Sequence, residues 1–264
     1  MLRIEHISKT FNPGTVNEKK ALAGLDLHLK EGEFLTVIGG NGAGKSTLLN
    51  AVAGTFPVDS GRILIGGRDV TSLPEHKRAA HIGRVFQDPM MGTAPTMQID
   101  ENLALAARRG GRRGLKWGIT REEKEIYYEK LKELGLGLED RMSAKVGLLS
   151  GGQRQALTLL MASLKKPQLL LLDEHTAALD PATAAKVLEI SDRIVRENGL
   201  TCMMITHNMR DAINLGSRLI MMNEGRIILD ISGEEKKKLT KRELLDRFAA
   251  LAGTQEETDA VLLS

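Results

Sequence analysis

The chain has 264 residues, and its content of 42% hydrophobic and 27% charged residues is typical of a globular protein and excludes a largely disordered one. The 37 basic residues nearly balance the 34 acidic ones, so the net charge of +3 argues against nucleic acid as a partner. The first residues carry charges, and no run approaches the roughly 18 apolar residues of a membrane span. We therefore expect any membrane role to pass through another chain.

The first 86 residues are predicted to form mostly strands and tight turns. Short β-branched or alternating segments, bounded by Gly, Pro or Asn, lie at 2–7, 24–29, 33–39, 61–67 and 81–86. One helix interrupts them, beginning near Lys45 and ending at Gly54, a residue type that commonly terminates helices. The character changes over residues 88–166, where helical spacing dominates and strand signals nearly vanish. We expect a helical insertion there.

Strands and helices alternate from residue 168 onward. Strands are predicted at 168–173 and 200–207, separated by a helix that starts at Asp180-Pro181, and a short helix then precedes a hairpin at 218–230. This alternation predicts a parallel α/β sheet. Cys202 is the single cysteine and lies in an apolar strand, so we expect it to pack in the core and favour a reducing compartment. The tail from Gly233 is predicted to form one amphipathic helix with a polar end.

A glycine-rich loop joins a predicted strand to the first predicted helix. The stretch "VIGGNGAGKSTLL" fits G-x-x-x-x-G-K-[ST] through Gly39, Gly44, Lys45 and Ser46. Glycines let the loop fold back with its N–H groups pointing inward on phosphates, the lysine adds a positive charge beside the β and γ groups, and the serine hydroxyl can ligate Mg²⁺. The sequence therefore predicts nucleotide binding here.

Two adjacent carboxylates follow a run of four leucines in "PQLLLLDEHTAALD". Such a run predicts a buried parallel strand, whose C-terminal end is where open α/β sheets bind ligands. Asp173 is placed to hold Mg²⁺ through water, and Glu174 to polarise an attacking water as general base. Gln87 and His207 also stand just past predicted strands, but neither is specific alone, because an isolated histidine is more often structural than catalytic.

The helix predicted in "GLLSGGQRQALTLL" begins on Ser150, Gly151 and Gly152, although glycine is costly in a helix. Backbone N–H groups with no side chains over them, at the positive end of a helix dipole, would form a docking surface for an anion. The alternative is a flexible hinge before the helix.

Together these features resemble the nucleotide-binding subunit of ATP-binding cassette (ABC) transporters, from about residue 2 to residue 232. "GGNGAGKST" resembles the Walker A loop, "LSGGQ" the signature, "LLLLDE" the Walker B strand and "AALD" the D-loop, while Gln87 and His207 match the Q-loop and switch histidine. The resemblance implies an α/β P-loop NTPase with a RecA-like parallel sheet core, an N-terminal antiparallel β subdomain and an inserted α-helical subdomain. We expect an ATP-binding domain over 1–232, with the helical subdomain over 88–166, and a helical tail over 233–264.

The resemblance also implies which residues serve ATP and Mg²⁺. Residues expected to contact the nucleotide are Phe11, Gly39, Gly40, Asn41, Gly42, Ala43, Gly44, Lys45, Ser46, Thr47, Ser150, Gly151, Gly152, Gln153 and Asp180. Residues expected to act in hydrolysis are Glu174, His207 and Gln87, and those expected to hold the metal are Ser46, Gln87 and Asp173. Phe11 stands where the family stacks a ring on adenine. The loop that follows Phe11 is longer than in the shortest family members, so packing of the ring into the protein interior is an alternative.

In this family two cassettes face each other head to tail, and "LSGGQ" of one docks on the γ-phosphate held by the other. The resemblance therefore implies a homodimer, or a pseudo-symmetric heterodimer, with two ATP molecules at its interface. It further implies permease subunits in the membrane, an extracytoplasmic substrate-binding protein and a peripheral location on the cytoplasmic face of the membrane, with no nucleic acid. Residues 145–184 and 216–237 resemble those of a bacterial subgroup of importer ATPases, some members of which are linked to tryptophan or tyrosine uptake.

Two features leave alternatives open. His175 stands where most family members carry proline, and we interpret it as a subgroup marker rather than a metal ligand, because no second Cys or His lies at ligand spacing. The basic run "RRGGRRGLKW" at 108–117 is either a solvated loop or a segment meeting acidic lipid heads or the permease, with Trp117 as anchor.

Two rival functions remain. A soluble ABC-type ATPase could act as an assembly or scaffold factor without a permease. A DNA-repair or chromosome ATPase is disfavoured, because the roughly 125 residues between the Walker motifs leave no room for a long coiled coil.

Overall fold

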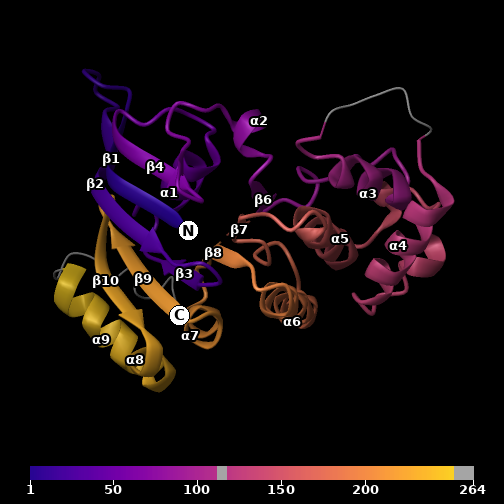
Figure 1. Ribbon diagram of the computed structural model, residues 1–264. Helices are drawn as coiled ribbons and strands as arrows, with labels where there is room; N and C mark the ends of the chain where they lie inside the picture. Colours follow the sequence, from indigo (N-terminus) through magenta and orange to yellow (C-terminus); the bar gives the residue numbers. More distant parts are fainter. Residues whose placement is uncertain (112–117, 253–264) are drawn as a thin grey trace. The chain divides into compact units, whose positions relative to one another are not determined.

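The computed structural model describes residues 1–111 and 118–252. The chain divides into two compact units, the first built from Met1–Arg78 together with the chain from Leu200 onward, and the second from Ala79–Gly199 (Figure 1). Each unit is described in turn.

The first unit opens with a four-stranded antiparallel sheet in the order β2-β1-β4-β5. Its strands are β1 (Leu2–Phe11), β2 (Lys19–Leu29), β4 (Ser60–Ile65) and β5 (Arg68–Asp69). Along β2, Leu25, Leu27 and Leu29 are buried while Asp26 and His28 are exposed, so one face packs and the other meets solvent. The predicted strands at 2–7 and 24–29 are therefore present, and both are longer than predicted.

A second group of strands in this unit surrounds β3 (Phe34–Ile38), which is buried along its whole length. The parallel neighbours of β3 are β8 (Thr201–Ile205) and β9 (Arg218–Asn223), and β10 (Arg226–Ser232) completes the predicted hairpin with β9. Cys202 in β8 is fully buried, as predicted, and burial raises the pKa of its thiol. The parallel β3, β8 and β9 strands bring their carboxyl ends to one edge.

Two helices follow the early strands, where the sequence predicts only one. The predicted helix is α1 (Lys45–Ala53), and Gly54 ends it with φ +85° as expected. The unpredicted helix, α2 (Glu75–Arg78), has a single turn and so no periodicity to detect. Its Arg78 is 2% exposed and donates hydrogen bonds to carbonyls that include those of Ala51 and Val52 at the end of α1. Tertiary contacts of one arginine therefore stabilise this turn.

The C-terminal part of the unit is helical and packs on the strands. Figure 1 shows α7 (Met209–Asn214), α8 (Gly233–Lys238) and α9 (Lys241–Ala252) beside β9 and β10. Phe248 and Leu244 of α9 join a core cluster with Met209, Met221 and Ile231. The prediction of one continuous tail helix is wrong. Thr240 accepts from the backbone N–H of Glu243, whose carboxylate accepts from the Thr240 N–H, and this reciprocal cap starts a new helix.

The second unit combines a parallel strand pair with helices. The strands β6 (Ile82–Val85) and β7 (Leu169–Asp173) pair in parallel. The helices are α3 (Ile99–Ala107), α4 (Arg121–Lys132), α5 (Gly151–Ser163) and α6 (Pro181–Glu197), with single 3₁₀ turns at Glu139–Arg141 and Val146–Leu148. Helix α5 contacts β6, α3, α4 and α6, so it is the central helix of the unit (Figure 1).

The predicted start of α6 is confirmed. Asp180 is its N-cap, accepting from the backbone N–H of Thr183 at 3.1 Å, and Pro181 occupies the first turn. Hydrogen bonds from the Thr183 hydroxyl and backbone also lower the pKa of the Asp180 carboxyl. The helix ends before Gly199, which has φ +56°.

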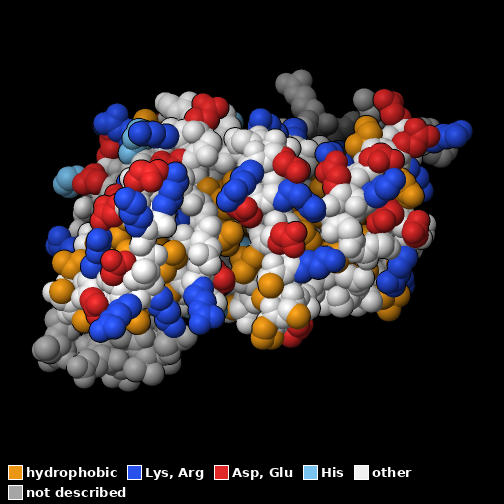
Figure 2. All heavy atoms as spheres, turned by 90° about the horizontal axis from the view of Figure 1, so that it is seen from below, with side chains coloured by type: hydrophobic (Ala, Val, Ile, Leu, Met, Phe, Trp, Pro, Cys, Tyr) orange, Lys and Arg blue, Asp and Glu red, His pale blue; other side chains and the backbone are white. Residues whose placement is uncertain are grey.

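Basic and acidic side chains are interspersed across the face shown in Figure 2. This distribution matches the near balance of 37 basic and 34 acidic residues. Within residues 1–111 and 118–252, no helix combines the length and apolar character needed to cross a membrane.

Candidate nucleotide-binding and catalytic sites

The glycine-rich loop leaves the carboxyl end of β3 and enters α1 in the first unit. Gly39 has φ +150°, and a Cβ there would lie 2.3 Å from the Met222 carbonyl oxygen. Gly44, the N-cap of α1, has φ +100°, and a Cβ there would lie 2.5 Å from the Ala21 carbonyl oxygen. Side chains at these positions would collide with backbone, so the loop requires glycine at both. Gly44 has no side chain to cap α1, and a helix N-terminus of this kind suits an anion.

Lys45 is the first residue of α1 and is only 8% exposed. Its Nζ donates to the carbonyl oxygens of Gly39 at 2.6 Å and Gly40 at 3.0 Å. The ammonium group therefore lies within the curl of the loop. Ser46, next along, is exposed, and Thr47 is half-buried. The loop thus encloses a positive charge beside the N-terminus of a helix, which is an arrangement suited to phosphate.

Phe11 ends β1, and its ring is half-buried. It packs edge-on against Phe56, with ring centroids 5.3 Å apart and an interplanar angle of 82°. Lys9 places its Nζ 5.7 Å from the Phe11 centroid and pairs with Asp59 at 2.9 Å. The ring is therefore held in one orientation but is not fully enclosed. Phe56 was not identified from the sequence, because it follows α1 and belongs to no motif.

His207 is exposed and lies between β8 and the Asn208 cap of α7. Val37 of β3 pairs in parallel with Ile205 of β8, so His207 and the glycine loop leave the same edge of the strands. This shared edge follows from parallel pairing and could be predicted from the sequence. Burial raises the pKa of the nearby Asp211 carboxyl, while the His207 ring acts to lower it.

In the second unit, the predicted carboxylates stand at the end of β7. Asp173 is 3.5 Å from the Arg84 guanidinium of the neighbouring strand β6, and both side chains are mostly buried. Arg84 also lies over the Phe86 ring, with its guanidinium carbon 4.5 Å from the centroid. Arg84 was not identified from the sequence, although a mostly buried arginine requires a partner. Glu174 adopts φ +42°, a left-handed conformation uncommon for a residue other than glycine.

Gln87 is exposed just beyond β6. Because Val85 pairs in parallel with Leu172, Gln87 and the carboxylates at the end of β7 leave the same edge. The fully buried Gln155 of α5 donates through Nε2 to the Phe86 carbonyl at 3.1 Å. Helix α5 therefore fixes the backbone from which Gln87 projects. Gln155 is a further residue that the sequence analysis missed.

The N-terminus of α5 carries a capping box. The backbone N–H of Gln153 donates to Ser150 Oγ at 3.3 Å, and the Ser150 N–H donates to Gln153 Oε1 at 3.2 Å. Gly151 is exposed, as a docking surface requires. Gly152 is buried, and a Cβ there would lie 2.1 Å from Thr183 Cγ2 on α6. The absence of a side chain at Gly152 therefore serves the packing of α5 on α6, which the sequence analysis did not anticipate.

His175, the residue after Glu174, is 2% exposed. Its Nε2 lies 2.9 Å from Oγ of Ser191, which is fully buried on α6 and donates to the Val187 carbonyl at 2.8 Å. Burial lowers the pKa of the imidazole to about 4. The ring is therefore neutral near pH 7 and bound to its own chain.

The His175 pKa predicts an acid-sensitive fold. In the unfolded chain the imidazole has its ordinary pKa of 6.5, against about 4 when folded, so the unfolded state binds more protons between these values. The unfolding free energy is expected to fall by about 3 kcal/mol as pH drops from about 6.5 to about 4. Denaturant unfolding at a series of pH values should show this loss in the wild type and a shallower one in His175→Gln. If the unfolding free energy fell equally with pH in both proteins, the assignment of this loss to His175 would be contradicted.

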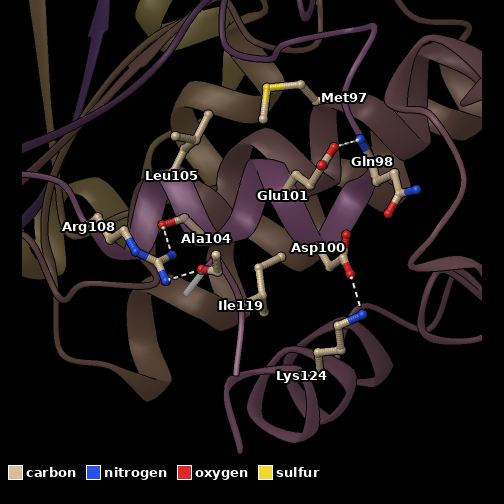
Figure 3. A pocket seen from close by; sticks show the side chains of 10 residues that line it. Met97, Gln98, Asp100, Glu101, Ala104, Leu105, Arg108, Ile119 and Lys124 are labelled. Atoms are coloured by element: carbon tan, nitrogen blue, oxygen red, sulfur yellow. Dashed lines mark hydrogen bonds and ion pairs between the residues drawn. The ribbon is translucent and has the colours of Figure 1, made fainter. Parts of the chain in front are cut away.

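A hollow of about 540 Å³ lies in the second unit, outside the motif residues. Figure 3 shows Asp100 and Leu105 of α3 lining it, with Lys124 of α4 pairing with Asp100 at 3.1 Å. Arg108 also lines it and pairs with Glu123 at 3.0 Å. Leu105 is 48% exposed.

The basic run at 108–117 is described only in part. Arg108 is held by Glu123, and Arg109 donates to the Ala162 carbonyl at 3.1 Å, so both arginines make contacts within the unit. Residues 112–117, including Trp117, lie outside the described residues. The two alternatives for that segment stay predictions.

The comparisons with known proteins agree with these features. The ABC transporter family matches residues 22–177. The chain is 44% identical over 253 residues to a tyrosine transport ATP-binding protein of Clostridioides difficile (strain R20291), covering 94% of this chain and 98% of that protein. It is 39% identical over 211 residues to the methionine import ATP-binding protein MetN of Rhizobium johnstonii (strain DSM 114642 / LMG 32736 / 3841), covering 79% of this chain and 56% of MetN.

Solved structures of ATP-binding cassettes share the fold. A dimeric post-hydrolysis structure of the cassette MJ0796, bound to ADP and phosphate, has a TM-score of 0.74 and 29% identity, covering 88% of this chain and 98% of that one. The ADP form of the cassette MJ1267 has a TM-score of 0.76 and 27% identity, covering 99% and 98%. The predicted fold class is confirmed.

The chain belongs to the ATP-binding subunits of ABC transporters. It is an ATPase of the importer type, and the predicted enzyme class and ATP binding are confirmed.

Proposed function

We propose that the chain binds ATP with Mg²⁺, hydrolyses it in a head-to-tail dimer and powers uptake of an amino acid, with tyrosine the first candidate, through a separate permease. The observation that carries the proposal is the glycine loop around Lys45, whose conformation admits only glycine at Gly39 and Gly44. The tyrosine transport relative, matched over 98% of its length, supports the substrate class.

We assign roles in ATP binding and hydrolysis to residues of each unit, taken separately. In the first unit, Phe11 would stack on adenine, the 39–47 loop would hold the phosphates and His207 would contact the γ-phosphate. In the second unit, Glu174 would act as general base on the attacking water, and Gln87 would help to orient it. The signature residues Ser150–Gln153, with Asp180, would serve the nucleotide of the partner subunit. The dimeric MJ0796 structure supports such an arrangement.

The residues assigned to Mg²⁺ suit it chemically. Ser46 offers a hydroxyl, Asp173 a carboxylate and Gln87 an amide carbonyl, and oxygen donors are the ligands that Mg²⁺ prefers. When bound, the ion would neutralise charge on the phosphates.

The remaining assignments concern the domains of the chain, its partners and its location in the cell. We propose an ATP-binding domain over 1–232 with its helical subdomain at 88–166, and a C-terminal tail over 233–264, of which residues 253–264 lie outside the described residues. We also propose a membrane permease and an extracytoplasmic binding protein as partners, and a position on the cytoplasmic face of the membrane; the similarity to a transport ATP-binding protein supports these assignments. We place the permease contact at the hollow between α3 and α4, because Leu105 exposes an apolar surface beside charged groups there.

Reconstitution tests this function. The chain and a candidate permease from its gene neighbourhood would be placed in proteoliposomes, and tyrosine uptake and ATP hydrolysis would be measured. Leu105→Glu is expected to lower permease-stimulated hydrolysis about tenfold and leave basal hydrolysis unchanged, because a charge replaces the apolar contact. Ile126→Glu, at a residue 50% exposed but outside the hollow, is the matched control. Equal effects of the two variants would contradict the placement of the permease contact at the hollow. Tyrosine uptake that does not depend on ATP would refute the transport role.

A further inference from the structure

The segment between β7 and α6 carries the proposed general base and is held at both ends. It begins at Glu174, whose φ of +42° is sparsely populated for a side chain other than glycine. Such a conformation persists only where the surrounding structure enforces it. At the far end, Asp180 caps α6. Near the start, the Ala177 N–H donates to the Glu174 carbonyl at 3.0 Å, which closes a turn.

His175 supplies a second restraint on the same turn. Its imidazole reaches Ser191, the eleventh residue of α6 and so roughly three turns along that helix. Both side chains are buried, at 2% and 0% exposure, so neither group has water as an alternative partner. The bond therefore ties the residue after Glu174 to the interior of α6.

The direction of this bond follows from counting protons. A serine hydroxyl has one hydrogen, and Ser191 donates it to the Val187 carbonyl at 2.8 Å. Ser191 Oγ is therefore an acceptor toward His175, and Nε2 of the imidazole must carry the hydrogen. The bond requires an N–H donor at this position, which an aliphatic side chain of similar size would not provide.

We propose that His175 is a positioning residue for ATP hydrolysis, and that its hydrogen bond to Ser191 holds the backbone of Glu174 in the conformation that directs its carboxylate. The inference rests on the proposed role of Glu174 as general base. General-base catalysis is sensitive to placement, since a shift of about 1 Å can cost about 10²-fold in rate. Nucleotide binding does not depend on the Glu174 carboxylate in this assignment, so the His175–Ser191 bond should affect kcat rather than affinity.

Four variants test the inference through the split between kcat and KM. Ser191→Ala and His175→Leu each remove the bond, and each is expected to lower kcat about tenfold with KM for ATP within about twofold. His175→Gln keeps an amide N–H near the position of Nε2 and is expected to retain at least half of wild-type kcat. The double variant His175→Leu/Ser191→Ala should be no slower than His175→Leu alone, because both changes break one bond.

Controls separate positioning from loss of stability. Ile190→Val trims a buried residue of α6 beside Ser191, and Glu189→Ala changes an exposed one. Thermal unfolding is measured for every variant. Ile190→Val should lower Tm without lowering kcat. Losses of kcat that are proportional to the loss of Tm across all variants would overturn the inference. A His175→Gln protein that is folded but has a low kcat would also overturn it.

A Glu174→Gln protein distinguishes this failure from failure of the proposed function. Wild-type hydrolysis by Glu174→Gln would refute the assignment of Glu174 as general base. The positioning role of His175 would then be refuted as well. An inactive Glu174→Gln together with a fully active Ser191→Ala would overturn only the positioning role.

Discussion

Replacement of Glu174 by glutamine is expected to lower kcat for ATP hydrolysis by about 10²–10⁴-fold and to leave ATP affinity within about twofold. The amide keeps the size and shape of the carboxylate but is unable to take a proton from water. The nucleotide contacts proposed for the glycine loop, which surrounds Lys45 in the first unit, would be unchanged. Since binding continues without turnover, ATP should accumulate on the protein and trap the dimer.

Single-turnover hydrolysis, equilibrium ATP binding and size exclusion with ATP measure the three parts of this result. Glu189→Gln makes the same chemical change at an exposed residue of α6 and should behave as wild type. A Glu174→Gln protein that binds ATP, fails to hydrolyse it and stays monomeric would contradict the closed dimer. Unchanged hydrolysis would instead contradict the assignment of Glu174.

Mixing a Ser150→Arg protein with a Lys45→Ala protein is expected to restore ATP hydrolysis that neither has alone. Ser150 is the exposed N-cap of α5, and arginine there would fill the space assigned to the γ-phosphate of the partner subunit. Lys45→Ala removes the charge enclosed by the glycine loop and should weaken nucleotide binding directly. In a mixed head-to-tail dimer, one of the two ATP sites contains both substitutions. The other contains an intact Lys45 and an intact Ser150.

If subunits exchange freely, about half of the dimers in an equimolar mixture are mixed, and each has one intact site. Turnover should therefore rise from near zero to a measurable fraction of wild type. Dimer formation with ATP is measured in parallel, because hydrolysis could require both sites. A mixture that restores neither property would refute the placement of the signature helix against the partner nucleotide. Ser163→Arg, a change at the opposite end of α5, serves as a control for the added charge.

These two experiments probe features that local sequence makes visible. The glycine loop, the acidic pair after the leucines and the Asp180-Pro181 helix start are each encoded in a few consecutive residues. Their backbone conformations follow from those residues: Gly39 and Gly44 have positive φ values, and Asp180 accepts from Thr183 as an N-cap. The break between α8 and α9 is equally local, because Thr240 and Glu243 form a capping box, but it was not predicted.

Tertiary structure decided the features that join distant parts of the chain. The turn α2 exists because Arg78 donates to carbonyls at the end of α1, and Asp173 has Arg84 beside it because β6 and β7 pair in parallel.

Gly152 and His175 show the same division between sequence and structure. The sequence by itself determined that a bare helix start follows Ser150 and that a histidine replaces the usual proline after Glu174. Only the packed structure showed that Gly152 makes room for Thr183 and that His175 bonds to Ser191. The physical reason is that capping and turn formation depend on neighbours along the chain, whereas steric fit and buried hydrogen bonds depend on neighbours in space.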